Sequence, residues 1–221
     1  MSRHLQRDLD SLHREILSLS GLVEEMIEKS IQSLFNRSFP LAEEVIAADE
    51  LTDQKEVLIE EECLKMLALH QPVAVDLRRI ATVMKVNNDL ERIGDLTVNI
   101  AERAKCLVQY PNFEIPRRME RMVDITRKMV AGALDAFVGL DSQAAMNVRH
   151  LDDDVDTLNR EIIYELQERM KASQAEIEPG LHCFSASRHI ERIADHASNI
   201  AEDVIYLVEG EIVRHQPGLS S

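Results

Sequence analysis

The chain has 221 residues and a formal net charge of −15; 45% of its residues are hydrophobic and 29% are charged. This composition predicts a folded globular protein, and the acidic charge argues against a nucleic-acid-binding protein, which would carry a basic face. Aromatic residues make up only 4% and Trp is absent, so the sequence is dominated by residues typical of long helices.

The first half of the chain predicts three long helices. Residues 5–35 and 41–69 each read as one helix, the first with apolar side chains at helical spacing and polar residues between them. A third helix is predicted from Pro72 to Val108. The segment Tyr110–Pro116 then forms the clearest break in the chain, because it contains two prolines, Pro111 and Pro116.

The second half repeats this plan. Residues 117–138 and 141–171 predict the fourth and fifth helices, and Glu178-Pro179-Gly180 is expected to end the fifth. The sixth helix then continues to about Val208. No stretch alternates at a period of two, so we expect no sheet.

The two halves therefore predict an all-α protein made of two tandem, pseudo-symmetric three-helix bundles with six long helices. Ser38 and Asp141 are both capping residue types and occupy the start of the second helix in each half. The first repeat is expected over residues 1–110, the second over residues 117–210, and a tail over residues 211–221.

The cysteines and the N-terminus predict a cytoplasmic protein. Three cysteines lie far apart in the sequence, which is typical of a reducing compartment. The N-terminus lacks the apolar segment of a signal peptide, and no apolar run approaches the roughly 20 residues that a membrane-spanning helix needs.

One thirteen-residue stretch occurs twice: residues 90–102 recur as residues 190–202, and eight of the thirteen positions are identical. Because positions i and i+4 share one face of a helix, the oxygen-bearing side chains of each copy form a stripe. The stripes consist of Glu91, Asp95, Asn99 and Glu102, and of Glu191, Asp195, Asn199 and Glu202. All-oxygen ligands suit a hard cation rather than a thiolate–imidazole zinc site. The alternative is a solvated acidic face with Arg92 and Arg103 as charge partners.

A second acidic pair lies on the second helix of each half. Asp49 and Asp53 are spaced i, i+4, and so are Asp152 and Asp156. The same spacing at corresponding places in both halves suggests a shared chemical role.

The predicted hairpin of the first half brings the two acidic pairs to one level. Helices joined by a short turn run antiparallel, and each rises about 1.5 Å per residue. From a turn near Gln71, Asp53 lies level with Glu91, and Asp49 lies level with Asp95. In the second half, the two helices of the hairpin again place Asp156 and Glu191 at the same height along their axes.

Four carboxylates at one level repel one another unless a positive charge lies between them. A hard cation, or a small cluster of cations, would neutralise this repulsion. We therefore predict two metal sites, built from Asp49, Asp53, Glu91 and Asp95, and from Asp152, Asp156, Glu191 and Asp195.

Three segments resemble the PhoU family, the phosphate-uptake regulators that accompany the bacterial Pst phosphate transporter. They are Gln71–Arg79 (QPVAVDLRR), Asn87–Asp95 (NNDLERIGD) and Asn99–Glu102 (NIAE). The resemblance covers nearly the whole chain, including its two-unit plan. In the second half Arg188-His189 replaces Asn88-Asp89, so its site is expected to differ in occupancy or affinity.

The resemblance implies a function and a set of partners. PhoU proteins are not known as enzymes; they repress the phosphate-starvation response by coupling the transporter's ATPase subunit (PstB-like) to a sensor histidine kinase (PhoR-like). Some bind multinuclear iron or zinc clusters through E(D)xxxD motifs, which match the eight acidic positions above; manganese and magnesium are further candidates. We also expect a homodimer that binds no nucleic acid and contacts the membrane only through its partners.

The alternative to a regulatory adaptor is a carboxylate-bridged, metal-dependent enzyme in a helical bundle. A di-metal oxidase would carry Glu-x-x-His pairs, and no His in this sequence has Glu three residues before it. A phosphohydrolase could use two metals held by carboxylates, but the sequence has no P-loop, nucleophile motif or Gly-rich phosphate cradle. A third reading is a structural helical protein with solvated acidic faces.

Overall fold

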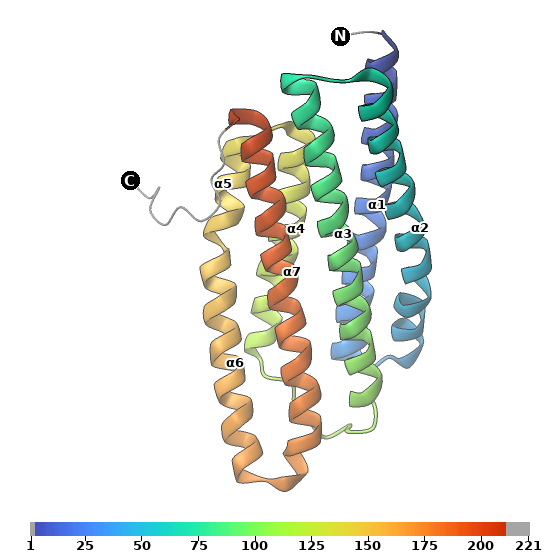
Figure 1. Ribbon diagram of the computed structural model, residues 1–221. Coiled ribbons are helices and arrows are strands. Elements are labelled where there is room, and N and C mark those ends of the chain that lie inside the picture. Colours follow the sequence, from blue (N-terminus) through green and yellow to red (C-terminus); the bar gives the residue numbers. More distant parts are fainter. Residues whose placement is uncertain (1–2, 211–221) are drawn as a thin grey trace.

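The computed structural model describes residues 3–210, which fold into helices and contain no β-strand (Figure 1). The helices are α1 (Arg3–Asn36), α2 (Phe39–His70), α3 (Ala74–Leu107), α4 (Arg118–Gly139), α5 (Ser142–His150), α6 (Asp152–Ala172) and α7 (Ile177–Glu209). Among these described helices, none combines the length and apolar character required to cross a bilayer. The predicted all-α, tandem-bundle fold is confirmed.

Two predicted helix starts are capped as their residue types indicate. The Ser38 side chain accepts a hydrogen bond from the backbone N–H of Leu41, and Pro40 lies in the first turn of α2. At the matching place in the second half, Asp141 Oδ1 accepts from the backbone N–H of Ala144 at 2.9 Å. Each cap satisfies one of the unpaired N–H groups at a helix start.

The predicted fifth helix, residues 141–171, is two helices, so this prediction was wrong. The chain breaks at Leu151, whose backbone N–H bonds to the carbonyl of Val148 at 3.0 Å instead of continuing the α-helical pattern. Three consecutive acidic residues, Asp152, Asp153 and Asp154, occupy the first turn of α6. Acidic side chains are stabilised at a helix N-terminus, which favours a new helix beginning here.

The predicted break at Glu178-Pro179-Gly180 was also wrong, because these residues belong to the first turn of α7. Proline is tolerated there, since a backbone N–H in the first turn has no intrahelical partner. The chain turns earlier, at the extended residue Ser173 and a short 3-10 helix, Gln174–Glu176.

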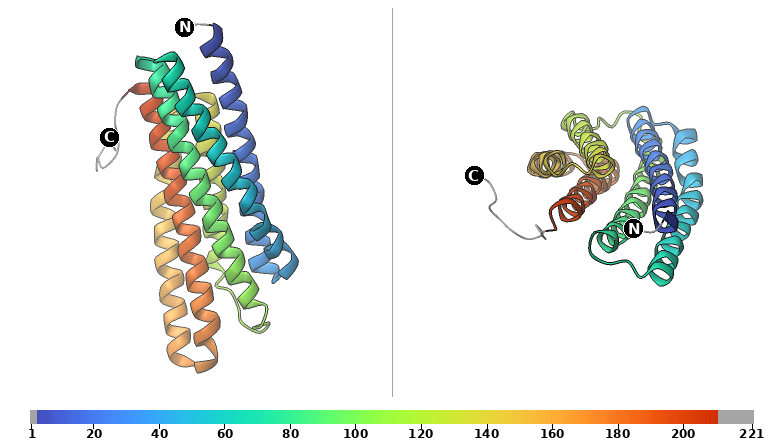
Figure 2. Two further views of the ribbon diagram at one scale, coloured as in Figure 1. Left: turned by 45° about the vertical axis from the view of Figure 1, so that its right-hand side comes forward. Right: turned by 90° about the horizontal axis from the view of Figure 1, so that it is seen from above.

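Helices α3 and α7 lie side by side and antiparallel at the centre of the molecule, joining the two bundles (Figure 1; seen from above in Figure 2). The apolar positions of the repeated stretch form this core. Ile93, Ile100, Ile193 and Ile200 are each at most 1% exposed. Burying each such side chain contributes about 1.5–3 kcal/mol, so the apolar positions of the repeat stabilise the core.

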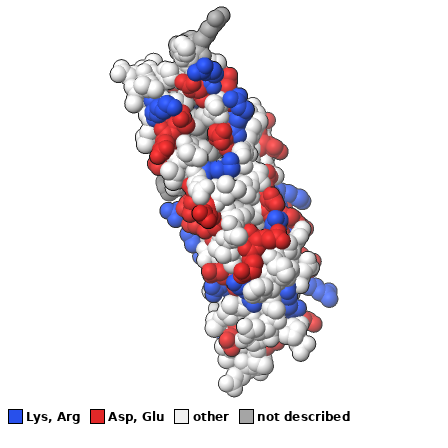
Figure 3. All heavy atoms as spheres, turned by 90° about the vertical axis from the view of Figure 1, so that its right-hand side faces the viewer, with Lys and Arg blue, Asp and Glu red and all other residues white. Residues whose placement is uncertain are grey.

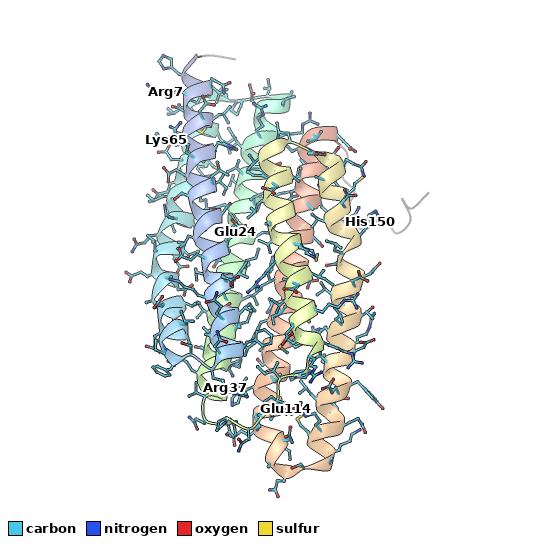
Figure 4. The ribbon with its side chains drawn as sticks, turned by 180° about the vertical axis from the view of Figure 1, so that it is seen from behind. Arg7, Glu24, Arg37, Lys65, Glu114 and His150 are labelled. Carbon is cyan, nitrogen blue, oxygen red and sulfur yellow. The ribbon has the colours of Figure 1, made fainter. Side chains whose placement is uncertain are left out.

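Arginines from both bundles donate hydrogen bonds to the linker between α3 and α4, residues 108–117. Arg37, at the end of α1, donates to the carbonyl of Phe113, and Arg169 of α6 donates to the carbonyl of Glu114 at 2.7 Å. Figure 4 labels Arg37 and Glu114 at this end of the molecule. The Phe113 ring is 5% exposed and lies 4.6 Å from the Arg169 guanidinium.

Candidate metal sites

Helices α2 and α3 place the first four acidic residues together in the predicted register. Burial raises the pKa of Asp49, and the carboxylates of Asp53 and Asp95 raise it further. Burial also raises the pKa of Glu91, with Asp95 and Asp53 adding to the rise and Arg92 opposing it. Each acid thus interacts with the other helix, as the hairpin from Gln71 predicts.

Arg92 supplies a positive charge to this first site. Its Nε lies 3.3 Å from Glu91 Oε2, and its Nη1 lies 3.4 Å from Asp95 Oδ2. The Arg92 and Asp95 side chains are 53% and 41% exposed, so these ion pairs contribute little to stability. Asn99 donates to the backbone carbonyl of Asp95 at 2.8 Å, within its own helix. A cation could therefore replace Arg92 at small cost.

On helices α6 and α7 the second four acidic residues repel one another more strongly. The pKa of Asp195 rises from 3.8 to about 6 because of burial and the nearby carboxylates of Glu191, Asp152 and Asp156, only partly offset by His196. Burial also raises the pKa of Glu191 and of Asp152. The four carboxylates of the second site therefore repel one another.

One carboxylate oxygen of the second site has no partner. Arg188 Nη1 lies 2.8 Å from Glu191 Oε1, whereas Glu191 Oε2 is buried without a hydrogen-bond partner among the described residues. On the other helix, Ser198 Oγ donates to Asp152 Oδ1 at 3.1 Å. An unpaired buried carboxylate oxygen is costly, and a bound cation would satisfy it.

The donor set of both sites fits a hard cation, since every candidate ligand is a carboxylate oxygen. As the side chains stand, residues 3–210 contain no group of three or more His, Cys, Asp or Glu that could hold a metal ion. Binding would require the carboxylates to rotate towards one another and away from Arg92 and Arg188. The side chains of Arg92 and Arg188 are 53% and 46% exposed, and exposed side chains change rotamer within picoseconds to nanoseconds, so the arginines can leave their acidic partners.

The second site opens into a groove of about 750 Å³ between α3 and α7. The groove is lined by Met84, Lys85, Asn88, Asp89, Asp152, Asp195, His196, Ser198, Asn199 and Glu202. Sequence reasoning missed the contribution of Lys85 and Asp89, which come from the first repeat. Asp89 lies within the NNDLERIGD motif, and that position was the available signal.

Acidic charge is not confined to the candidate sites. Figure 3 views the face formed mainly by α1 and α2, where carboxylates and basic side chains are interspersed among uncharged ones. Ion pairs such as Lys29 with Glu25 at 2.9 Å and Lys29 with Glu44 at 3.0 Å lie on these helices. The overall acidity of the chain therefore does not locate a site; the paired spacing on two helices does.

Comparisons with known proteins match nearly the whole chain to one family. The family model described as PhoU domain matches residues 5–104 and 119–204. The chain is 40% identical to the phosphate-specific transport system accessory protein PhoU homolog of Aquifex aeolicus, over 96% of each chain. It is 38% identical to the homolog of Pseudomonas putida, over 97% of this chain and 84% of that one.

Two solved structures share the fold. The crystal structure of PhoU from Pseudomonas aeruginosa superposes with a TM-score of 0.90 at 37% identity, covering 93% of this chain and 99% of that one. The crystal structure of the phosphate transport system regulatory protein PhoU from Streptococcus pneumoniae gives 0.88 at 30% identity, covering 95% and 99%.

Proposed function

The chain belongs to the PhoU family, and we propose that it is an accessory protein of a phosphate-specific transport system. Relatives that carry this name align with nearly all of the chain, so the role concerns the whole protein rather than one part of it. An accessory role also favours a non-enzymatic protein over the metal-dependent phosphohydrolase or oxidase.

The finer proposal is that the protein is a cytoplasmic adaptor. It would contact the ATPase subunit of the transporter and a sensor histidine kinase, and so repress the phosphate-starvation response when phosphate is plentiful. A rigid double bundle suits this role, because its long helical faces keep both contact surfaces at a fixed separation.

Metal binding is the part of the proposal that depends on specific residues. Asp49, Asp53, Glu91 and Asp95 would hold one iron, zinc or manganese centre, and Asp152, Asp156, Glu191 and Asp195 would hold the other. The observation that carries the proposal is the second site, where four interacting carboxylates include the unpaired, buried Glu191 Oε2. A bound cation would supply the missing positive charge.

The chain's own residues would then do two things. The carboxylates would link α2 to α3 and α6 to α7, which stiffens both hairpins. Arg92 and Arg188, released from their acidic partners, would turn outward and add positive charge to the surface presented to a partner. Metal occupancy would thus change both the rigidity and the surface charge of the adaptor.

The test measures association of the purified chain with the transporter's ATPase subunit, with added metal and with chelator. We expect association in both conditions and tighter association with metal. The double variant Asp95→Asn with Asp195→Asn should behave like the chelated protein, whereas Asp124→Asn, on an exposed part of α4, should behave like the unmodified chain. No association under any condition would refute the adaptor; equal affinity with and without metal would refute a role for the metal in it.

A further inference from the structure

The interface between α3 and α7 carries opposite charges at its two ends. The two copies of the repeat are offset by 100 residues, so Lys85 corresponds to Ser185 and Asp203 corresponds to Arg103. Likewise Asp89 corresponds to His189. Two acidic positions at one end of the interface are thus basic or imidazole positions at the other.

At the acidic end, Lys85 and His196 are paired with carboxylates across the two helices. Lys85 Nζ of α3 lies 2.9 Å from Asp203 Oδ1 of α7. His196 Nδ1 of α7 lies 2.8 Å from Asp89 Oδ1 of α3. Both carboxylates are buried, so this end is neutralised within the protein.

At the opposite end, Arg103 and His189 lack these carboxylates. Arg103 Nη2 bonds only to its own neighbour, Glu102, at 3.0 Å, and His189 Nε2 bonds to Ser185 Oγ at 3.2 Å. Two buried nitrogen atoms are left over: Arg103 Nε and His189 Nδ1 have no hydrogen-bond partner within the part of the chain that the structure describes. A buried donor without a hydrogen bond destabilises the folded protein, and binding an acceptor would remove this penalty.

The bond between Ser185 and His189 is compatible with a proton on His189 Nδ1. When the Ser185 hydroxyl donates to Nε2, the proton of the neutral imidazole lies on Nδ1. Arg103 Nε always carries a proton. Both leftover nitrogens are then N–H donors without an acceptor.

The charge of Arg103 acts on two histidines of α7, and the register of the helices agrees with this. Burial lowers the pKa of His182, and Arg103 lowers it further. Burial also lowers the pKa of His189; Arg192 and Arg103 add to the effect, and the Glu102 carboxylate opposes it. Arg103 lies 18 residues after Lys85 on α3, and Ser185 lies 18 residues before Asp203 on α7. In this antiparallel pair Arg103 is therefore level with Ser185, as Lys85 is level with Asp203.

We propose that Arg103 and His189, with Ser185 orienting the imidazole, form a binding site for a tetrahedral oxyanion of the phosphate type. An arginine guanidinium matches the oxygen spacing of phosphate, and an N–H donor on a second helix fixes its orientation. Arg192 adds positive charge nearby, whereas the Glu102 carboxylate acts on both Arg103 and His189, so a bound anion would have to displace it.

This site goes beyond the proposed function, because it uses none of the eight candidate metal ligands and takes an anion rather than a cation. It joins α3 of the first repeat to α7 of the second. An anion bound there would supply the negative charge that Asp89 and Asp203 supply at the other end. Anion binding would therefore tighten the contact between the two repeats.

The test is calorimetric titration of the full-length chain with inorganic phosphate in the presence of a chelator, so that protein-bound metal does not contribute. We expect saturable binding of one phosphate per chain. Arg103→Gln should weaken binding about tenfold or more, because a charge-assisted hydrogen bond is lost. Ser185→Ala should weaken it severalfold by freeing the imidazole. Arg160→Gln, which removes an exposed charge from α6, is the matched control and should leave binding unchanged.

The outcomes separate the site from general attraction of anions. Equal binding by the unmodified chain and Arg103→Gln, equal weakening by Arg160→Gln, or no saturable binding would overturn the proposal. If thermal unfolding shows that Arg103→Gln is not folded, His189→Gln replaces it with the same expected loss. Phenyl phosphate is titrated in parallel: tighter binding of the monoester, lost in Arg103→Gln, would mean that the site takes a phosphoryl group carried on a larger molecule.

Discussion

Neutralising Asp195 should make the metal-free protein more stable while it removes a metal ligand. The pKa of Asp195 rises from 3.8 to about 6 on folding, through burial and the carboxylates of Glu191, Asp152 and Asp156. At about 1.4 kcal/mol per pKa unit this rise corresponds to about 3 kcal/mol of destabilisation by the ionised form. Part of the side chain still contacts solvent, which screens this repulsion, so we expect about 1 kcal/mol.

The effect has a defined dependence on pH. The folded protein binds this proton at higher pH than the unfolded chain, so the penalty is absent below pH 3.8 and grows to its full size above about 6. Asp195→Asn carries no charge at any pH. Its gain in stability should therefore be about 1 kcal/mol near pH 8 and about half of that near pH 5.

The assay is urea unfolding of both proteins in the presence of chelator, with Asp124→Asn as the control on exposed α4. The control should change the free energy of unfolding by less than about 0.5 kcal/mol at either pH. A loss of stability in Asp195→Asn near pH 8 would refute the reasoning, since it would mean that favourable contacts of this carboxylate outweigh its repulsion.

Three further predictions concern the core, the thiols and the repeat. Ile193→Ala should lower the free energy of unfolding by about 2–5 kcal/mol in urea, whereas Leu181→Ala, at a position 54% exposed, should change it little; similar effects would refute the central core. Burial raises the pKa of both Cys63 and Cys183 to about 12, so neither should react with iodoacetamide near neutral pH until the protein is unfolded. A fragment of residues 1–111 should form a marginal three-helix unit that binds metal at one site; a folded fragment without metal would contradict pairing within one repeat.

Local sequence signals predicted most of the helical plan. The caps at Ser38 and Asp141 and the turn at Gln71 depend on residues next to them in the chain, so a single sequence reveals them. The hairpin register follows from these turns and the constant rise of a helix, which is why α2 and α3 bring their acidic residues together as predicted.

The misplaced boundaries and the missed residues have different causes. The break at Leu151 reflects competition between helical periodicity and three acidic residues that favour a helix N-terminus. Pro179 signals a break only when it lies inside a helix, and its place in the first turn depends on where α7 begins. The contacts of Asp89 with His196 and of Lys85 with Asp203 join residues more than a hundred positions apart, which no local pattern specifies.

The most direct test of the account is elemental analysis by mass spectrometry of the protein purified without chelator or affinity tag, together with the double variant Asp95→Asn and Asp195→Asn. The account predicts stoichiometric iron, zinc or manganese in the unmodified chain. It predicts loss of that metal in the double variant, with helical content by circular dichroism nearly unchanged. Absence of metal even after reconstitution, or equal metal in both proteins, would contradict the carboxylate sites.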